Sequence, residues 1–201
     1  MSRLLMIRHG ATAWNEAGRI QGRSDPPLSP GGRAAVSSWR LPAEIKAARW
    51  LTSPLARARE TAEILHGSEV AADPRLIETD WGAWEGKTLA AMRAELGEAM
   101  TDNEALGLDF RPPGGESPRD LQQRLRPLLS ELAAAGGTTV AVSHKGIIRA
   151  LYALASGWDM RAKPPVKLRD GCLQAFTLAV DGAPRIEALN VTLQVAAERT
   201  P

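Results

Sequence analysis

Two short, mainly apolar runs, each with a histidine and a glycine just after it, constrain the fold of this chain most. Leu4-Leu5-Met6-Ile7 precedes Arg8-His9-Gly10, and Val140-Ala141-Val142-Ser143 precedes His144, with Gly146 close behind. Unbroken apolar runs of this length are typical of strands that are buried on both faces of a parallel sheet. The chain has three histidines. Two of them therefore share the context of a strand end that opens into a turn.

Helix-start signals alternate with the apolar segments along the chain. Ser29-Pro30, Ser53-Pro54 and Ser117-Pro118 each place a serine before a proline, which is the N-cap and first-turn pattern of a helix. Alternating strands and helices predict a parallel sheet with crossover helices. The predicted strands are residues 3–7, 50–52, 70–72, 138–143, 166–169, 173–180 and 185–191, and the predicted helices are residues 29–39, 53–65, 88–96, 120–135 and 147–155.

In the last part of the chain the predicted strands follow one another without a helix between them. Asp181-Gly182 between the last two predicted strands is a hairpin-turn signal, so we expect an antiparallel edge on the sheet. Pro127 lies inside the predicted helix 120–135 and should kink or split it. The segment 100–113 has no clear period and is expected to be irregular. The pattern predicts a three-layer α/β/α sandwich with a mostly parallel central sheet, as one domain over residues 1–201 with an excursion near residues 97–116 over the site.

Composition excludes several protein classes. The 201 residues are enough for one hydrophobic core, and 44% hydrophobic with 24% charged residues is typical of a globular protein. The net charge of +2 comes without a basic block, which argues against a nucleic-acid partner. No run approaches the ~20 apolar residues of a membrane span, and the apolar stretch before Arg8 is too short for a signal peptide. Cys172 is the only cysteine, which excludes an intramolecular disulfide.

From this we expect a cytoplasmic protein with no membrane or nucleic-acid partner. The sequence leaves the oligomeric state open, with a homodimer as one option, because an exposed apolar face has the same pattern as a core face.

Arginines accompany the predicted strand ends. Arg8 directly precedes His9, and Arg57 lies in the helix start that follows the strand 50–52. Open α/β sheets bind ligands at the carboxyl ends of their strands. A helix N-terminus beside guanidinium groups is an anion site. The sequence therefore predicts an anionic ligand at this edge of the sheet.

In their order and spacing, these motifs resemble the histidine phosphatase superfamily, which is also called phosphoglycerate mutase-like. The motifs that carry the resemblance are Arg8-His9-Gly10-Ala11-Thr12-Ala13-Trp14-Asn15, Gly18-Arg19-Ile20-Gln21-Gly22, Asp25-Pro26-Pro27-Leu28-Ser29, Ser53-Pro54-Leu55-Ala56-Arg57-Ala58, Leu76-Ile77-Glu78, Trp81-Gly82-Ala83-Trp84-Glu85-Gly86, Pro113-Gly114-Gly115-Glu116-Ser117 and Val142-Ser143-His144-Lys145-Gly146. Any single motif is weak, but the whole ordered set is a strong signal. The resemblance implies the three-layer fold and phosphoryl transfer.

The resemblance also implies residue roles. His9 would become phosphorylated, Glu78 would protonate the leaving group, and Arg8, Arg57 and His144 would clamp the phosphoryl oxygens. The residues that would add substrate contacts are Asn15, Gln21 and Gly22. Phosphoryl transfer needs these groups, because it requires a nucleophile, cations around the equatorial oxygens and a proton for the leaving alkoxide. His9 can attack only while unprotonated, and flanking cations such as Arg8 and Arg57 disfavour its imidazolium.

No metal or cofactor is expected. His9 and His144 have no third histidine or aspartate cluster to complete a metal site, and their cationic surroundings would repel a divalent ion. Gly31-Gly32 and Gly114-Gly115 lack the G-x-x-x-x-G-K-[ST] spacing of a nucleotide-binding loop.

The sequence departs from the mutases of the family. These carry a lysine three residues beyond the glycine that matches Gly86, followed by an Arg-Arg pair; here Leu89 stands at the lysine position, and Arg93 is the only arginine between Thr88 and Leu108. We therefore predict a metal-independent phosphomonoester hydrolase that forms a phosphohistidine. Two alternatives stay open: a phosphoglycerate-type mutase, and a non-catalytic phosphate-binding relative. The substrate also stays open among sugar, glycerate, α-ribazole and other small phosphates.

Overall fold

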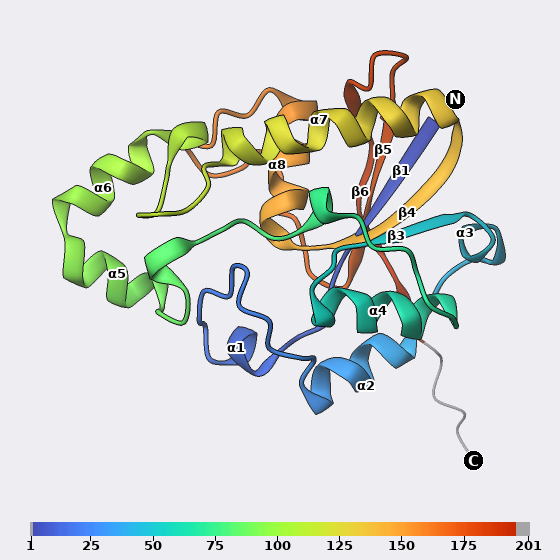
Figure 1. Ribbon diagram of the computed structural model, residues 1–201, viewed down its shortest axis with the longest axis horizontal. Coiled ribbons are helices and arrows are strands. Elements are labelled where there is room, and N and C mark those ends of the chain that lie inside the picture. Colours follow the sequence, from blue (N-terminus) through green and yellow to red (C-terminus); the bar gives the residue numbers. More distant parts are fainter. Residues whose placement is uncertain (1, 196–201) are drawn as a thin grey trace.

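A mixed five-stranded sheet forms the centre of the computed structural model, which describes residues 2–195 (Figure 1). The strand order is β3-β4-β1-β5-β6. Three neighbouring strands are parallel: β3 (Arg49–Thr52), β4 (Gly137–Ser143) and β1 (Ser2–Arg8). The antiparallel strands β5 (Cys172–Leu178) and β6 (Pro184–Thr192) complete the sheet on the β1 side. The predicted parallel centre and antiparallel edge are confirmed.

Helices cover both faces of this sheet. One face packs against α7 (Pro118–Ala135) and α8 (Lys145–Ser156), and the other against α2 (Pro30–Ser38) and α4 (Ala56–His66). Strand β1 supplies both cores, because successive side chains of a strand point to opposite faces. Leu4 and Met6 belong to the α7 and α8 core, whereas Leu5 and Ile7 belong to the core under α4. The predicted three-layer α/β/α sandwich is confirmed.

Short elements connect the layers and form the excursion. The remaining helices are α1 (Ala13–Glu16), α3 (Ala43–Lys46), α5 (Leu89–Leu96) and α6 (Glu98–Ala105), with single 3₁₀ turns at η1 (Pro74–Leu76), η2 (Gly82–Trp84) and η3 (Gly107–Asp109). A second, two-stranded sheet pairs β2 (Trp39–Arg40) with β7 (Gln194–Val195). No helix among residues 2–195 is long and apolar enough to cross a membrane.

Several predicted boundaries were wrong. Helix α4 begins at Ala56 rather than at Ser53, because the Ser53 hydroxyl lies 2.7 Å from Nε2 of His144 and does not cap the helix. The segment 70–72 forms only a bridge from Ala72 to Thr52, and 166–169 is not a strand. Apolar content alone predicted these two strands, but neither segment lies along a neighbouring strand over its length.

The excursion is more regular than predicted. Residues 98–105 form helix α6 and residues 107–109 a 3₁₀ turn, because Met100 is buried against Met92 and Trp84 in a small separate core. Helix α7 runs without a split through Pro127. Both Pro127 and Gln123, whose carbonyl loses its partner there, are exposed, so water can satisfy that carbonyl.

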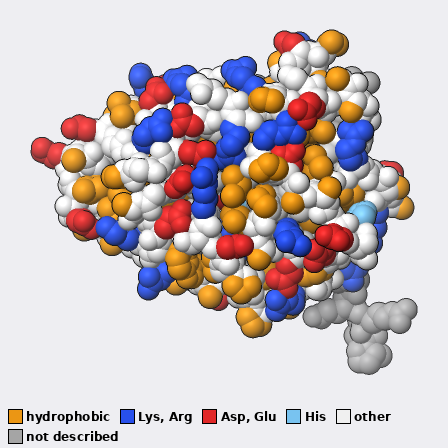
Figure 2. Space-filling model, viewed as in Figure 1, with side chains coloured by type: hydrophobic (Ala, Val, Ile, Leu, Met, Phe, Trp, Pro, Cys, Tyr) orange, Lys and Arg blue, Asp and Glu red, His pale blue; other side chains and the backbone are white. Residues whose placement is uncertain are grey.

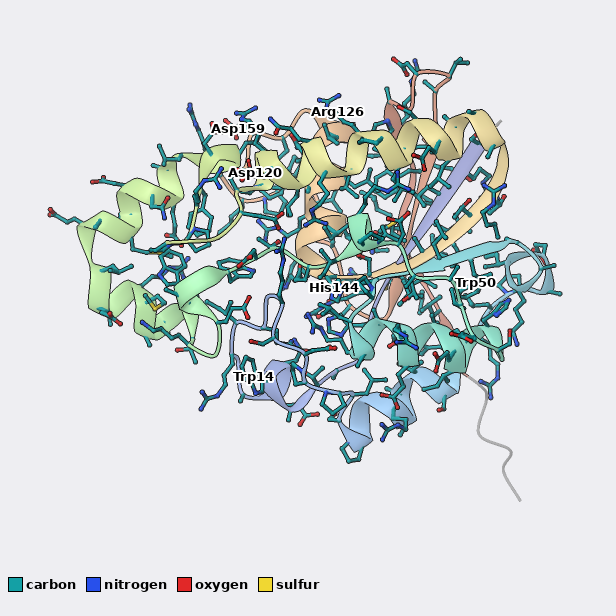
Figure 3. All side chains as sticks on the ribbon, in the orientation of Figure 1. Trp14, Trp50, Asp120, Arg126, His144 and Asp159 are labelled. Carbon is teal, nitrogen blue, oxygen red and sulfur yellow. The ribbon has the colours of Figure 1, made fainter. Side chains whose placement is uncertain are left out.

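The parallel register brings three strand ends together. Arg8 pairs with Ser143, and Thr52 pairs with Val142. The backbone N–H of His9 then donates to the Ser143 carbonyl at 3.0 Å. The side chains that follow β1, β3 and β4 therefore meet at one edge of the sheet, near the centre of the molecule where His144 is labelled in Figure 3.

Candidate active site

His9 is a buried, neutral imidazole with one free nitrogen. Its Nδ1 lies 2.6 Å from the Gly10 carbonyl oxygen, which can only accept a hydrogen bond, so Nδ1 carries the proton. Nε2 is therefore the unprotonated atom, and Nε of Arg57 donates to it at 3.3 Å. Burial, and then the charges of Arg8 and Arg57, lower the pKa of His9 to about 3. The geometry and the electrostatics both keep Nε2 available as a nucleophile.

Arg57 is held rigidly in the first turn of α4. Its guanidinium is fully buried and donates from Nη1 to the Ser24 carbonyl and from Nη2 to the Gly22 carbonyl, both at 2.8 Å. Gly22 has φ +58°, and a Cβ there would collide with the Glu85 carboxylate. The loop after the first helix can approach the Glu85 carboxylate because this position is a glycine.

His144 lies beside His9, directly after β4. The two ring centroids are 5.1 Å apart, and His144 has no exposed surface. Its Nε2 contacts the Ser53 hydroxyl at 2.7 Å, while Nδ1 is buried with no hydrogen-bond partner among residues 2–195. Burial, followed by the nearby His9 and Arg57, holds the pKa of His144 well below its usual value. An unpaired buried nitrogen is costly, so this position suits a ligand that supplies the missing partner.

Arg8 reaches the cavity from the end of β1. Its Nη1 forms an ion pair with Asp170 at 2.6 Å, and its Nε is buried without a partner among residues 2–195. Asp170 was not predicted, because it is distant in sequence and carries no motif. It fixes one end of the guanidinium and leaves the remaining N–H groups for an anion.

Glu78 is anchored by the backbone on both sides of its carboxylate. Oε1 accepts from the Thr79 N–H at 2.8 Å, and Oε2 accepts from the Gly146 N–H in the first turn of α8 at 3.3 Å. A Cβ at position 146 would collide with both Glu78 and Thr79. The glycine that follows His144 is thus needed for the close approach of α8 to Glu78, a role that the sequence pattern did not reveal.

Three further predicted residues line the same cavity as His9. Asn15 belongs to α1, where its Oδ1 accepts from the Thr12 N–H at 3.1 Å and its NH₂ group is left for a ligand. Gln21 lies on the loop after α1, with its Oε1 2.9 Å from the Thr12 hydroxyl, and Gly22 follows it. All three line the cavity.

The cavity is much larger than a phosphate group needs. Its volume is about 580 Å³, which is in the range of sites for organic ligands. Arg8, His9, Arg57 and Glu78 line one part of it. The large apolar residues of the remaining lining are Ile20, Trp81, Leu89, Phe110, Leu121 and Met160. The basic residues to which the sequence analysis gave no role are Arg19, Lys145, Arg149, Arg161 and Lys163. His144 lies behind the lining, against His9.

Residues of the excursion contribute to the cavity. Glu104, Gly107 and Phe110 line it. Trp81 also lines it, whereas Trp84 is buried in the core of the excursion. Among residues 2–195 no group of three or more His, Cys, Asp or Glu side chains is arranged to hold a metal ion.

Known proteins share both the sequence and the fold. The chain matches the histidine phosphatase superfamily (branch 1) over residues 4–192. It is 38% identical over 166 residues to glucosyl-3-phosphoglycerate phosphatase of Mycobacterium tuberculosis, which covers 75% of this chain and 74% of that protein. It is 33% identical over 180 residues to probable phosphoglycerate mutase GpmB of Serratia proteamaculans, which covers 85% of this chain and 82% of that protein.

A solved structure gives the same result. The mycobacterial glucosyl-3-phosphoglycerate phosphatase in complex with VO3 superimposes with a TM-score of 0.79 at 29% identity, covering 96% of this chain and 100% of that one. The family match spans both strand ends that carry His9 and His144. This chain therefore belongs to the histidine phosphatase superfamily.

Proposed function

We propose that this chain hydrolyses a small phosphomonoester and that Nε2 of His9 is the nucleophile. Hydrolysis of phosphomonoesters through a phosphohistidine is the activity that the family and its phosphatase relatives support. The observation that carries the residue assignment is the hydrogen bond from Nδ1 of His9 to the Gly10 carbonyl, because it leaves Nε2 unprotonated inside the cavity. Covalent capture then divides one difficult displacement into two easier ones.

In the first step, Nε2 of His9 attacks phosphorus and the bond to the leaving oxygen breaks. The guanidinium groups of Arg8 and Arg57 stabilise charge on the equatorial oxygens, and the buried Nδ1 of His144 acquires a hydrogen-bond partner. Protonated Glu78 gives its proton to the leaving oxygen. In the second step, the Glu78 carboxylate takes a proton from water, which attacks phosphorus, breaks the bond to Nε2 and releases inorganic phosphate.

The part of the cavity wall near Leu89 lacks the cations with which the mutases of the family hold a phosphorylated acid. Leu89, at the position where the mutases carry a lysine, lines the cavity as an apolar residue. Arg93 also lines it, but its guanidinium is paired with Glu104 at 2.6 Å. The cations that would hold a mutase substrate on this wall are therefore absent or already neutralised in the described part of the chain.

Phosphate accounting tests hydrolysis against transfer. We expect p-nitrophenyl phosphate to yield one inorganic phosphate for each nitrophenol, with or without added 3-phosphoglycerate, and we expect chelation by EDTA to have no effect. Phosphate release that falls behind nitrophenol while a bisphosphorylated acid accumulates would identify a mutase. Loss of activity on chelation would revive a metal-dependent mechanism.

Arg57 and Arg59 provide a matched test of the phosphate clamp. Arg57→Ala removes the buried guanidinium beside Nε2 and should lower kcat/KM by about 10²–10³-fold, as loss of an oxyanion donor does elsewhere. Arg59 lies two positions further along α4 and is exposed, so Arg59→Ala should stay within about twofold of the unaltered protein. Steady-state kinetics on one aryl phosphate compares them, and equal losses in the two variants would show that the clamp is misplaced.

A further inference from the structure

Six basic side chains line the cavity outside the group that surrounds His9. Arg93 is paired with Glu104 and Arg19 donates to the Gly86 carbonyl, which leaves four. Lys145 and Arg149 belong to α8, and Arg161 and Lys163 to the segment that follows it. Nothing in the proposed chemistry of the phosphoryl group uses them. Their place in the cavity therefore requires another explanation.

Among the arginines of this cavity, Arg149 combines partial burial with the lack of an ion pair, whereas Arg19 and Arg161, which also form no ion pair among residues 2–195, are exposed. It is half-buried, its guanidinium carbon lies 5.1 Å from the centre of the Trp158 ring, and no carboxylate among residues 2–195 forms an ion pair with it. Arg8 and Arg93, by contrast, are paired with Asp170 and Glu104. Burial lowers the pKa of Arg149, but a guanidinium stays charged at neutral pH. A partly buried charge without a counterion is unfavourable, and a bound anion would relieve the cost.

The acidic residues of the cavity do not neutralise this basic wall. Glu104 is committed to Arg93, and Glu116 to Arg23 and Arg124. Glu78 is held by backbone N–H groups near His9. Basic and acidic side chains are interspersed on the surface that Figure 2 shows. The basic side chains of this wall, in contrast, form no ion pair with a carboxylate among residues 2–195.

The basic wall extends along α8 from the end of the helix that lies next to His144. Lys145 directly follows His144, and Arg149 comes four residues later on the same face of the helix. At about 1.5 Å rise per residue, Arg149 starts roughly 6 Å further along the helix axis than Lys145. The cavity is larger than a phosphate group needs, so it has room for an anion at Arg149 beside a phosphate that contacts His9.

We propose that the substrate carries a second anionic group, several bonds away from the transferred phosphate, and that Arg149 binds it with help from Lys145 and Lys163. This inference rests on the proposed function. Trp158 fixes the guanidinium plane, so that its free N–H groups face the ligand as a fork suited to a carboxylate or a second phosphate. The apolar lining residues, such as Trp81 and Phe110, would contact the carbon skeleton between the two anions.

A series of synthetic phosphomonoesters tests the proposal. The probes are O-phosphorylated ω-hydroxyalkanoic acids with two to six methylenes, the neutral methylamide of each, and the alkanediol bisphosphates of matching length. At the chain length that fits the cavity best, we expect kcat/KM for the carboxylic acid to exceed kcat/KM for its methylamide by about 10- to 100-fold. This factor corresponds to one charge-assisted hydrogen bond. The carboxylate and bisphosphate arms show which anion the site prefers.

The variant Arg149→Met keeps a long side chain against Trp158 and removes the charge. It should bring the ratio of kcat/KM for the acid to kcat/KM for the amide to within about twofold of one. Partial loss of folded protein does not change this ratio, because it lowers both values equally. The control is Arg126→Met on the outer side of α7, which should leave the ratio unchanged (Figure 3). A ratio near one in the unaltered protein, or a ratio that survives Arg149→Met, would overturn the second-anion proposal while p-nitrophenyl phosphate hydrolysis upholds the proposed function. If the protein hydrolyses neither p-nitrophenyl phosphate nor any of the synthetic esters, both the proposed function and the second-anion proposal are overturned.

Discussion

Replacing His9 by alanine is expected to abolish turnover and covalent phosphate labelling while leaving the fold intact. The loss in kcat should be on the order of 10⁴-fold or more, because among residues 2–195 His9 is the only histidine that lines the cavity. The His9 ring contacts the Gly10 carbonyl and the Arg57 guanidinium, and the backbone of β1 holds its place in the sheet. Release of p-nitrophenol measures the loss, and circular dichroism checks the fold.

His144→Ala is the matched control for that loss. It removes the second histidine at the same sheet edge but leaves Nε2 of His9, so residual turnover with phosphate still carried by His9 is expected. Acid-labile phosphate that persists in His9→Ala, or that is found on His144, would contradict the assignment.

The lowered pKa of His9 also predicts how kcat/KM depends on pH. Because burial, Arg8 and Arg57 lower the pKa of His9 to about 3, the free enzyme keeps Nε2 unprotonated as pH falls through the ordinary range of histidine near 6.5. The profile of kcat/KM should therefore show no loss from His9 between pH 7 and about pH 4.

Glu78→Gln is expected to slow alkyl phosphates by about 10²–10⁴-fold and p-nitrophenyl phosphate far less. An alkyl phosphate expels a poor alkoxide that needs a proton, whereas nitrophenolate leaves unaided. The same carboxylate would activate water in the second step, so the phosphoenzyme should accumulate with the aryl substrate. Comparing kcat/KM for ethyl and p-nitrophenyl phosphate, together with phosphoenzyme after rapid denaturation at alkaline pH, measures both effects.

Glu85→Gln is the control for that experiment. The Glu85 carboxylate accepts from the N–H groups of Arg23 and Ser24 at 2.7 and 2.8 Å and so supports the loop that holds Arg57. Its loss should affect alkyl and aryl substrates alike. If Glu78→Gln instead slows both equally without phosphoenzyme build-up, Glu78 is not the proton donor, and Glu116, which also lines the cavity, becomes the next candidate.

The sequence predicted the part of the fold that positions the site, because parallel strands end at one edge of a sheet. The apolar runs before His9 and His144 became the neighbouring strands β1 and β4, with Arg8 and Ser143 in register. Arg57 and Glu78 were found through motif order, and the structure brings both to the same cavity. The residue roles themselves stay predictions.

Other features depend on contacts between distant segments. Ser53 has the pattern of an N-cap, but a hydrogen bond to His144, which follows the neighbouring strand β4, overrides it. Asp170 on Arg8 and Trp158 under Arg149 likewise join residues without a shared local pattern. Helix α6 was missed because its apolar residues are few, and its packing around Met100 becomes visible only when the excursion is folded.

The most direct test of the central claim is the position of the covalent phosphate on the native enzyme. Rapid acid-free denaturation during turnover, followed by peptide mass spectrometry and ³¹P NMR, should place one phosphoryl group on Nε2 of His9, because Nδ1 is occupied by its hydrogen bond to Gly10. Phosphate on Nδ1, on another residue, or on no residue while turnover continues would contradict it.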